Sequence, residues 1–221
     1  MVHRRLFYII ILLSLSTLIF GNEKTLGKRK YLLDTPKKEN IKNILIWCHP
    51  ASGDPKPEFN WIKQSKILDG QTILVCPQAS ARQWTMKRDE KFILALIKEL
   101  MKRYKIEKSN ILMGGHSSGA LFTYDFGLKH QKYFHHLITA CGVMRKKPKK
   151  ATKDSPKITI YHSIDDLVFP IKLARDSAKI LLKFKYKLTF IEDRLKHSIG
   201  PKLATALKKG LKEMNEPVHK K

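Results

Sequence analysis

Cysteine is scarce in this chain, with three residues in 221. So few thiols exclude a small fold held together mainly by disulfides. Cys48, Cys76 and Cys141 each stand at the end of an apolar, strand-like run, where a thiol behaves as a small apolar group. We therefore expect buried free thiols. One disulfide is the alternative for an exported protein. Residues on neighbouring parallel strands seldom meet the geometry of a disulfide, however, and with three cysteines one thiol would remain unpaired.

Acidic residues are also few, because 19 Asp and Glu stand against 44 Lys and Arg, which gives a formal net charge of +25. Loss of Arg4 and Arg5 with an N-terminal signal would leave +23 (25 − 2). Such a field attracts anionic polysaccharide, lipid headgroups or nucleic acid. The basic residues are spread along the chain, with one cluster at 145–150, and aromatic residues do not alternate with them. We expect a solvated, lysine-rich surface that can associate with anionic surfaces, and no specific nucleic-acid site.

The chain has a single long apolar run, at 6–20, which follows a basic start and precedes Gly21. This pattern predicts a signal peptide over 1–21 and export to the periplasm or the medium. Ile19 is large for the position three residues before a cut after Gly21, so an uncleaved N-terminal anchor is the alternative. No cysteine follows the run, which argues against lipid attachment. Residues 22–221 are enough for one sizeable core, and we expect one domain there.

Short apolar runs alternate with helical patterns along the rest of the chain, without an internal repeat. This alternation predicts an α/β fold with a mostly parallel central sheet and helices on both faces. The expected strands are 30–33, 44–48, 72–76, 111–113, 137–141, 158–162 and 188–191. The expected helices are 90–104, 121–130, 172–182 and 201–214. The polar, basic segment 146–156 is expected to be an exposed loop, too short to form a large lid.

The most informative motif is Gly115-His116-Ser117-Ser118-Gly119, which lies between the apolar strand 111–113 and a helical segment. A serine on a tight turn from strand to helix exposes its hydroxyl at the carboxyl edge of a sheet, and glycines on both sides remove Cβ clashes. The motif therefore predicts that Ser117 is a nucleophile. An ordinary turn serine is the alternative.

A nucleophilic serine needs a base and an acid, and both residue types follow at predicted strand ends. Asp165 and Asp166 come just after the strand at 158–162, and His197 follows the strand at 188–191. The order Ser117, Asp166, His197 is that of the α/β-hydrolase triad. We prefer Asp166 as the acid and keep Asp165 as the alternative. Asp166 could also cap a helix, and His197 could be a surface histidine.

At these residues the sequence resembles the α/β-hydrolase superfamily. Within it, the chain is similar to small secreted esterases of the polyhydroxybutyrate depolymerase and feruloyl esterase type, which are related to the phospholipase/carboxylesterases. The resemblance covers 29–214 and includes Arg29 to Leu33 with Pro36, Cys76-Pro77-Gln78 with Trp84 and Asp89, Phe92-Ile93, and His162 with Asp166 and Pro170. It implies the α/β-hydrolase fold and favours Asp166 over Asp165. Because the segment 146–156 is short, we expect a minimal lid, and a mechanism built on serine, histidine and aspartate calls for no metal or cofactor.

The chain departs from the family pattern in three places. His49 is followed by Pro50 where a glycine is usual, Ser163 replaces a glycine, and Lys196 stands where a glycine often precedes the last histidine. Proline has no N–H to donate to an oxyanion. We therefore expect the oxyanion donors to be the backbone N–H of Ser118 and that of either Ala51 or Ser52. His49, His116 and Trp84 are expected beside the substrate cleft.

Two functions from different classes follow. The preferred one is an exported serine esterase that cleaves a carboxylic ester, small or linked to polysaccharide, lipid or polyester, through an acyl-enzyme. The alternative is a non-catalytic member of the fold that binds an anionic partner through its basic surface. The motifs do not separate esterase from thioesterase or peptidase, and they leave acyl and alcohol specificity and the oligomeric state open.

Overall fold

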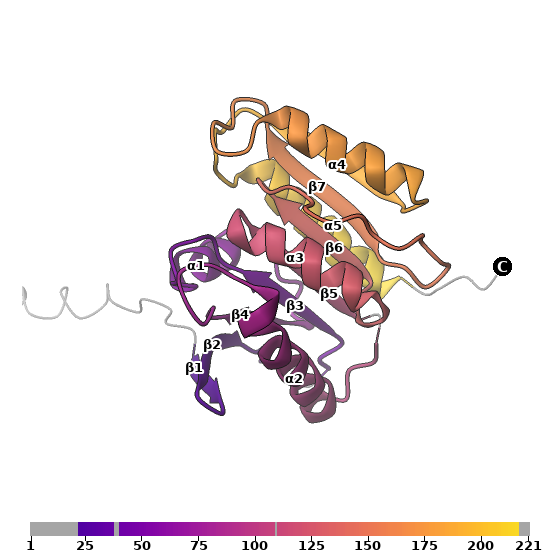
Figure 1. Cartoon of the computed structure of the whole chain (residues 1–221). Helices are drawn as coiled ribbons and strands as arrows, with labels where there is room; N and C mark the ends of the chain where they lie inside the picture. Colours follow the sequence, from indigo (N-terminus) through magenta and orange to yellow (C-terminus); the bar gives the residue numbers. More distant parts are fainter. Residues whose placement is uncertain (1–21, 38–39, 109, 217–221) are drawn as a thin grey trace, which may run out of the picture.

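A computed structural model describes residues 22–37, 40–108 and 110–216 of the chain (Figure 1). The predicted signal peptide lies outside these residues. Eight strands form one sheet in the order β1-β2-β4-β3-β5-β6-β7-β8. Their bounds are β1 Asn22–Leu26, β2 Arg29–Asp34, β3 Asn43–Cys48, β4 Thr72–Pro77, β5 Ile111–His116, β6 His136–Ala140, β7 Lys157–Ser163 and β8 Leu188–Asp193. β1, β2 and β4 pair antiparallel, whereas β4, β3, β5, β6, β7 and β8 pair parallel in that order.

Helices cover both faces of the sheet. Their bounds are α1 Lys56–Gln64, α2 Met86–Tyr104, α3 Ser118–Lys129, α4 Ile171–Lys183 and α5 Pro201–Asn215, with a short 3₁₀ turn at Gln131–Tyr133. Apolar side chains of α2, α3 and α4 share one core cluster, and those of α1 and α5 share the cluster on the other face. Figure 1 shows α2, α3 and α4 in front of the sheet with α5 behind it. The predicted α/β architecture, with a mostly parallel sheet between two helical layers, is therefore confirmed.

The central strands read as continuous apolar runs because both of their faces are buried. All six residues of β3 are buried, with Leu45 and Trp47 in one core and Ile44 and Ile46 in the other. The expected apolar stripe of α2 is also present. Its buried residues are Asp89, Phe92, Ile93, Leu96, Ile97 and Leu100. The helix begins at Met86, earlier than predicted, because the Thr85 side chain caps it by accepting the Arg88 N–H.

One strand and one α-helix, β1 and α1, were not predicted from the sequence. β1 is a polar, exposed strand that forms a hairpin with β2, and it lacks the apolar alternation that would indicate a strand. α1 begins among prolines and buries only Glu58, Phe59 and Ile62. The predicted strand 137–141 is displaced by one residue, because β6 begins at His136 and ends at Ala140, and Cys141 takes a left-handed φ of 49°.

The three cysteines are free and buried, as expected. Burial raises the pKa of each thiol, and that of Cys141 reaches about 12. The segment 146–156 contains no helix or strand and is mostly exposed, which confirms the expected loop. Among the residues that the structure describes, no helix combines the length and the apolar character needed to cross a lipid bilayer.

Candidate active site

The predicted site residues lie at the carboxyl edge of the parallel strands. Ser117 follows β5, Asp166 follows β7 and His197 follows β8. Parallel strands place their carboxyl ends at one edge of the sheet, so loops that are distant in sequence meet there. Residues 80 positions apart, Ser117 and His197, are thereby brought into hydrogen-bonding contact.

Ser117 occupies a strained turn between β5 and α3. Its φ of 53° and ψ of −115° lie outside the regions that non-glycine residues favour. The flanking glycines allow this turn because they let the strand, the helix and β3 approach closely. A Cβ added at Gly119 would lie 2.0 Å from the carbonyl oxygen of Cys48, and one at Gly115 would lie 2.6 Å from the carbonyl carbon of Gly119. The predicted geometry of the serine turn is present.

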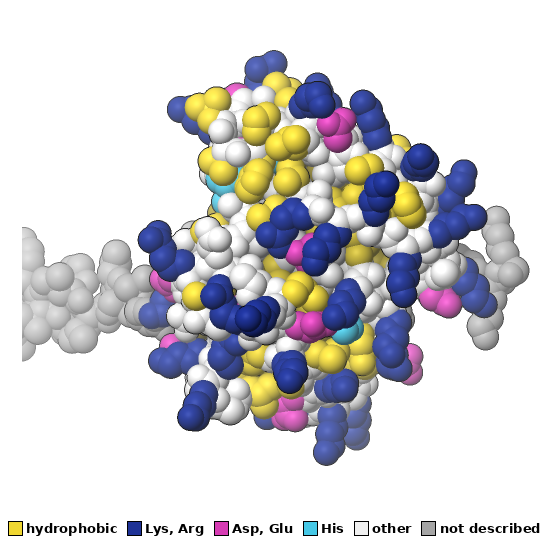
Figure 2. Space-filling view, viewed as in Figure 1, with side chains coloured by type: hydrophobic (Ala, Val, Ile, Leu, Met, Phe, Trp, Pro, Cys, Tyr) yellow, Lys and Arg dark blue, Asp and Glu magenta, His cyan; other side chains and the backbone are white. Residues whose placement is uncertain are grey.

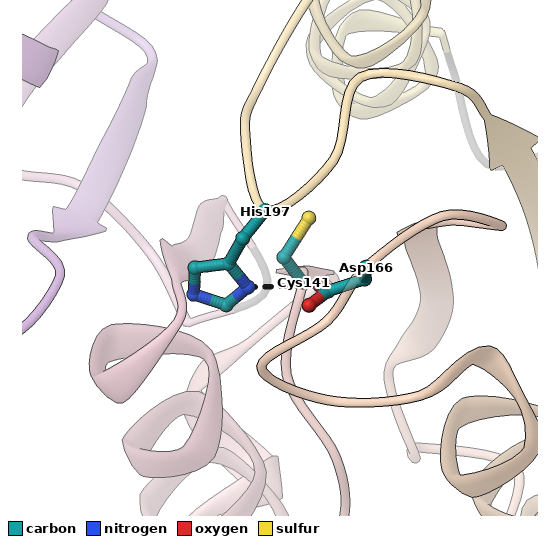
Figure 3. A group of neighbouring side chains, drawn as sticks. All are labelled: Cys141, Asp166 and His197. Carbon is teal, nitrogen blue, oxygen red and sulfur yellow. Dashed lines mark hydrogen bonds and ion pairs between the residues drawn. The ribbon is translucent and has the colours of Figure 1, made fainter.

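Three side chains form a continuous hydrogen-bond chain. The Ser117 hydroxyl lies 2.8 Å from Nε2 of His197, and Nδ1 of His197 lies 2.8 Å from Oδ2 of Asp166. Figure 3 shows the contact between His197 and Asp166. Asp165 is exposed and points elsewhere, since its Oδ1 accepts from the Ser163 hydroxyl at 2.6 Å and from the Lys196 N–H at 2.9 Å. The structure thus pairs His197 with Asp166 rather than with Asp165.

Asp166 is held rigidly at the start of its loop. Its side chain is fully buried, and Oδ1 accepts the backbone N–H groups of Val168 and Phe169 at 2.8 and 2.9 Å. The ring of His162 supports the same loop, because its Nε2 donates to the carbonyl oxygen of Phe169 at 2.7 Å. Burial lowers the pKa of His162, which favours its neutral form. One carboxylate therefore both closes the loop and orients His197.

Two departures from the family pattern have structural roles in the loop that carries His197. The Ser163 hydroxyl accepts the Leu195 N–H at 2.8 Å, a contact that a glycine could not make. Lys196 adopts a φ of 55°, the left-handed conformation that glycine favours, and its N–H donates to Asp165. Ser163 and Asp165 therefore tie the loop after β8 to the loop after β7.

The loop after β3 approaches the serine turn from the other side. His49 is fully buried, and its Nε2 accepts the Ala79 N–H at 3.1 Å, so Nδ1 carries the proton and donates to the Pro50 carbonyl oxygen at 2.6 Å. The Ser52 N–H is already engaged, since it donates to the Pro50 carbonyl oxygen at 2.8 Å. Within the described part of the chain, the Ala51 N–H has no acceptor. Of the two predicted donors in this loop, Ala51 is the one left available.

Trp84 connects this loop to the serine turn. Its backbone N–H donates to the Ser118 hydroxyl at 3.1 Å, and its indole N–H donates to the His49 carbonyl oxygen at 2.9 Å. Trp84 and His49 are buried, and the expectation that they lie beside the substrate cleft stays a prediction. His116 is 8% exposed, close to the 9% of Ser117, and its place beside the cleft stays a prediction.

Comparison with known proteins places the chain in a family. Residues 73–215, more than half of the sequence, match the family model described as Phospholipase/Carboxylesterase. The chain belongs to the phospholipase/carboxylesterase family. No curated protein matches it in sequence. The match begins at β4 and includes the turn of Ser117 and the loops of Asp166 and His197.

Solved structures agree with this fold at low sequence identity. A Bacillus cereus carboxylesterase superposes with a TM-score of 0.69 at 13% identity, covering 85% of this chain and 95% of its own. A phospholipase/carboxylesterase from Dyadobacter fermentans has a TM-score of 0.67 at 13% identity, covering 89% and 98%. The acyl-protein thioesterase 2 of Zea mays has a TM-score of 0.62 at 16% identity, covering 84% and 99%. The α/β-hydrolase fold extends over most of the chain.

One member of the site was missed by the sequence analysis. Glu58 of α1 is buried, and its Oε1 lies 2.6 Å from Nδ1 of His116, while its Oε2 accepts the indole N–H of Trp47. The ring of His116 lies against that of His197, with 5.3 Å between centroids. A lone glutamate after two prolines gives no sequence signal for such a role. The buried carboxylate of Glu58 thus contacts His116, the residue that precedes Ser117.

A second unexpected neighbour is Cys141, which lies beside Asp166 and His197 (Figure 3). One potential metal-ligating atom from each of the three residues lies within 4.8 Å of the others. Burial raises the pKa of the thiol to about 12, so Cys141 is protonated at neutral pH and donates to the Ser198 carbonyl oxygen at 3.4 Å. A metal ion bound here would need the thiolate and would compete for the Asp166–His197 hydrogen bond.

Proposed function

We propose that this protein is a serine hydrolase that cleaves a carboxylic ester, with Ser117 as nucleophile, His197 as base and Asp166 as the acid that orients His197. The observation that supports this proposal is the hydrogen-bond chain from Ser117 through His197 to Asp166, with 2.8 Å at both contacts, on a strained serine turn. The family to which the chain belongs supports hydrolysis. The non-catalytic alternative is not favoured, since a basic surface alone gives no reason for this arrangement.

The reaction follows from the positions of the donors and acceptors. As Ser117 Oγ attacks the ester carbonyl, His197 Nε2 takes the hydroxyl proton, and Asp166 stabilises the imidazolium that forms. The backbone N–H groups of Ser118 and Ala51 would stabilise the oxyanion. Ser118 is the first residue of α3, so its N–H has no acceptor within the helix. The imidazolium then protonates the leaving alcohol, and an acyl-enzyme remains.

Deacylation repeats these steps with water. His197 takes a proton from the attacking water, the tetrahedral intermediate collapses, and Ser117 regains its proton as the carboxylic acid leaves.

We also propose that the protein is exported and that its substrate is an ester of the kind cleaved by polyhydroxybutyrate depolymerases and feruloyl esterases. A thioester is the competing substrate, because one similar structure is that of an acyl-protein thioesterase.

The test combines turnover with active-site labelling. Wild type should hydrolyse a short-chain p-nitrophenyl ester and react with a fluorophosphonate probe at Ser117. Ser117→Ala should lose both, with kcat falling at least about 10⁴-fold. The exposed Ser198 lies in the loop of His197, and Ser198→Ala is the matched control that keeps both activities. Equal labelling of wild type and Ser117→Ala would refute the proposal, and parallel thioester assays would separate the two substrate classes.

A further inference from the structure

Large apolar side chains are exposed at only a few positions among the residues that the structure describes. They are Leu167 at 89%, Val168 at 58%, Leu182 at 55%, Leu173 at 44% and Leu195 at 38%. Single exposed leucines are ordinary, but a cluster on one side of a protein indicates an interaction surface. All except Leu182 belong to the loops of Asp166 and His197 or to the first turn of α4. We call Leu167, Val168, Leu173 and Leu195 the apolar rim.

The apolar rim is one surface because hydrogen bonds join its loops. Leu195 donates its N–H to Ser163, and the next residue, Lys196, donates its N–H to Asp165, so the two loops lie side by side. Leu173 N–H donates to the Pro170 carbonyl oxygen, which attaches the start of α4 to the same loop. Figure 2 shows hydrophobic side chains gathered at the upper left, over the loop that leads into α4. The rim therefore borders the proposed active site.

Hydrogen bonds to Asp166 fix the loop that carries Leu167, the most exposed residue of the apolar rim. Asp166 accepts the N–H groups of Val168 and Phe169, and the Phe169 ring lies 5.8 Å from the His197 ring. Leu167 therefore protrudes from a fixed loop, and its 89% exposure makes it a projection rather than the wall of a pocket. A small ester could cover little of such a side chain. Burial of Leu167 requires a partner that receives it, as the apolar layer of a lipid surface does.

Charge decides between a lipid surface and a second copy of the chain. Arg194 and Lys196 are exposed beside the rim, and Lys172 and Lys179 extend from α4, where Asp176 is their acidic neighbour. A second copy would bring a formal charge of +25 against the same charge. An anionic lipid surface instead attracts these groups while it receives the leucines.

We propose that the apolar rim docks the protein on lipid surfaces that carry anionic headgroups. Leu167 and Val168 enter the boundary between headgroups and acyl chains, the neighbouring basic side chains contact the lipid phosphates, and the edge that carries Ser117 faces the surface. Lipid contact through this rim does not depend on the proposed hydrolysis. If both hold, esters embedded in that surface reach the site directly.

The decisive experiment introduces a fluorescent reporter at the rim and at a matched position outside it. Leu167→Trp and Leu182→Trp are compared in the full chain, with vesicles of phosphatidylcholine alone or mixed with phosphatidylglycerol, and with brominated lipid as quencher. Both variants keep residues 1–21, so any contribution of that segment is the same in the two. We expect quenching in the mixed vesicles for Leu167→Trp, and no quenching above the wild-type background for Leu182→Trp.

A binding measurement completes the test. In sedimentation with the mixed vesicles, Leu167→Ser should weaken binding about tenfold, whereas Leu182→Ser should stay within twofold of wild type. Added salt should also weaken binding. Equal quenching at both positions, equal binding of both serine variants, or dimerisation that buries position 167 without lipid would overturn the proposal. Turnover is not measured, so an inactive enzyme would not affect the result.

Discussion

The turn of Ser117 and the two loops of Asp166 and His197 meet at one edge of the sheet but are held by different forces. The serine turn lies between fully buried strands, and its glycines touch the backbone of β3. The loops after β7 and β8 lie at the surface, where hydrogen bonds from Asp166, Ser163 and Asp165 hold them. Close packing therefore positions the nucleophile, and a polar network positions its partners.

This difference predicts which substitutions each region tolerates. Packed backbone cannot yield to an added atom without moving a strand, because interiors are close-packed. A surface loop that loses one hydrogen bond keeps its other contacts, and water can replace part of what was lost. We therefore expect substitutions of the glycines in the turn to affect the stability of the whole fold, and substitutions in the loops to affect mainly the rate of reaction. The following changes test that contrast.

The largest effect is expected for Gly119→Ala. The new Cβ would lie 2.0 Å from the Cys48 carbonyl oxygen, which is backbone, so the serine turn or β3 must move. We expect a loss of about 4 kcal/mol or more in the free energy of unfolding, measured with urea. Gly127→Ala in the same helix is the control, because there the atoms nearest the Cβ belong to the side chain of Leu137 and not to the backbone, so a side-chain rotation can relieve the contact. Equal stability of the two variants would contradict the packing argument.

A large effect on rate, without loss of fold, is expected for Asp166→Asn. Its amide would still fill the loop but would no longer stabilise the imidazolium of His197, so kcat on a p-nitrophenyl ester should fall about 10⁴-fold. Asp165→Asn should stay within about tenfold of wild type, since Asp165 contacts the loop and not the ring. A larger loss for Asp165→Asn than for Asp166→Asn would reverse the assignment.

The smallest effect is expected on the free energy of unfolding at acidic pH, through protonation of His49, which supports the loop beside the serine turn. Burial lowers the pKa of His49 in the folded protein below 6.5, so the unfolded chain binds this proton at higher pH. The free energy of unfolding should therefore fall as the pH falls from about 7 to 5. His135, His136 and His162 act in the same direction, because burial lowers their pKa values too, that of His136 to about 4.

The contribution of His49 to this pH dependence is measured by comparing the free energy of unfolding of wild type with that of a variant that lacks the histidine. Urea unfolding of wild type and of His49→Gln is compared at pH 7 and pH 5. His49→Gln keeps an acceptor for the Ala79 N–H but does not titrate, so its loss on acidification should be smaller by about 1 kcal/mol, the size of one buried hydrogen bond. An identical loss in both proteins would show that protonation of His49 does not weaken this region.

Sequence patterns predicted most of the fold and the proposed triad for identifiable reasons. The buried strands β3, β4 and β5 are apolar runs, and α2 carries a regular apolar stripe. Ser117 is marked by its glycines, and Asp166 and His197 by their places after strands. By contrast, β1 is exposed and polar, and Glu58 is a single carboxylate in a short helix that begins among prolines. Neither carries a periodic signal.

The sequence alone predicts the layered α/β fold, the residue types of the proposed triad and their order, because hydrophobic periodicity and glycine placement are local properties of the chain. The remaining relations needed the three-dimensional structure. It pairs His197 with Asp166 rather than with Asp165, and it places Glu58 against His116. Among the described residues, it leaves the Ala51 N–H without an acceptor while that of Ser52 is engaged, and it joins four exposed apolar residues into one rim. These are relations between segments far apart in sequence. They depend on where the sheet brings the segments together, and no local pattern encodes that.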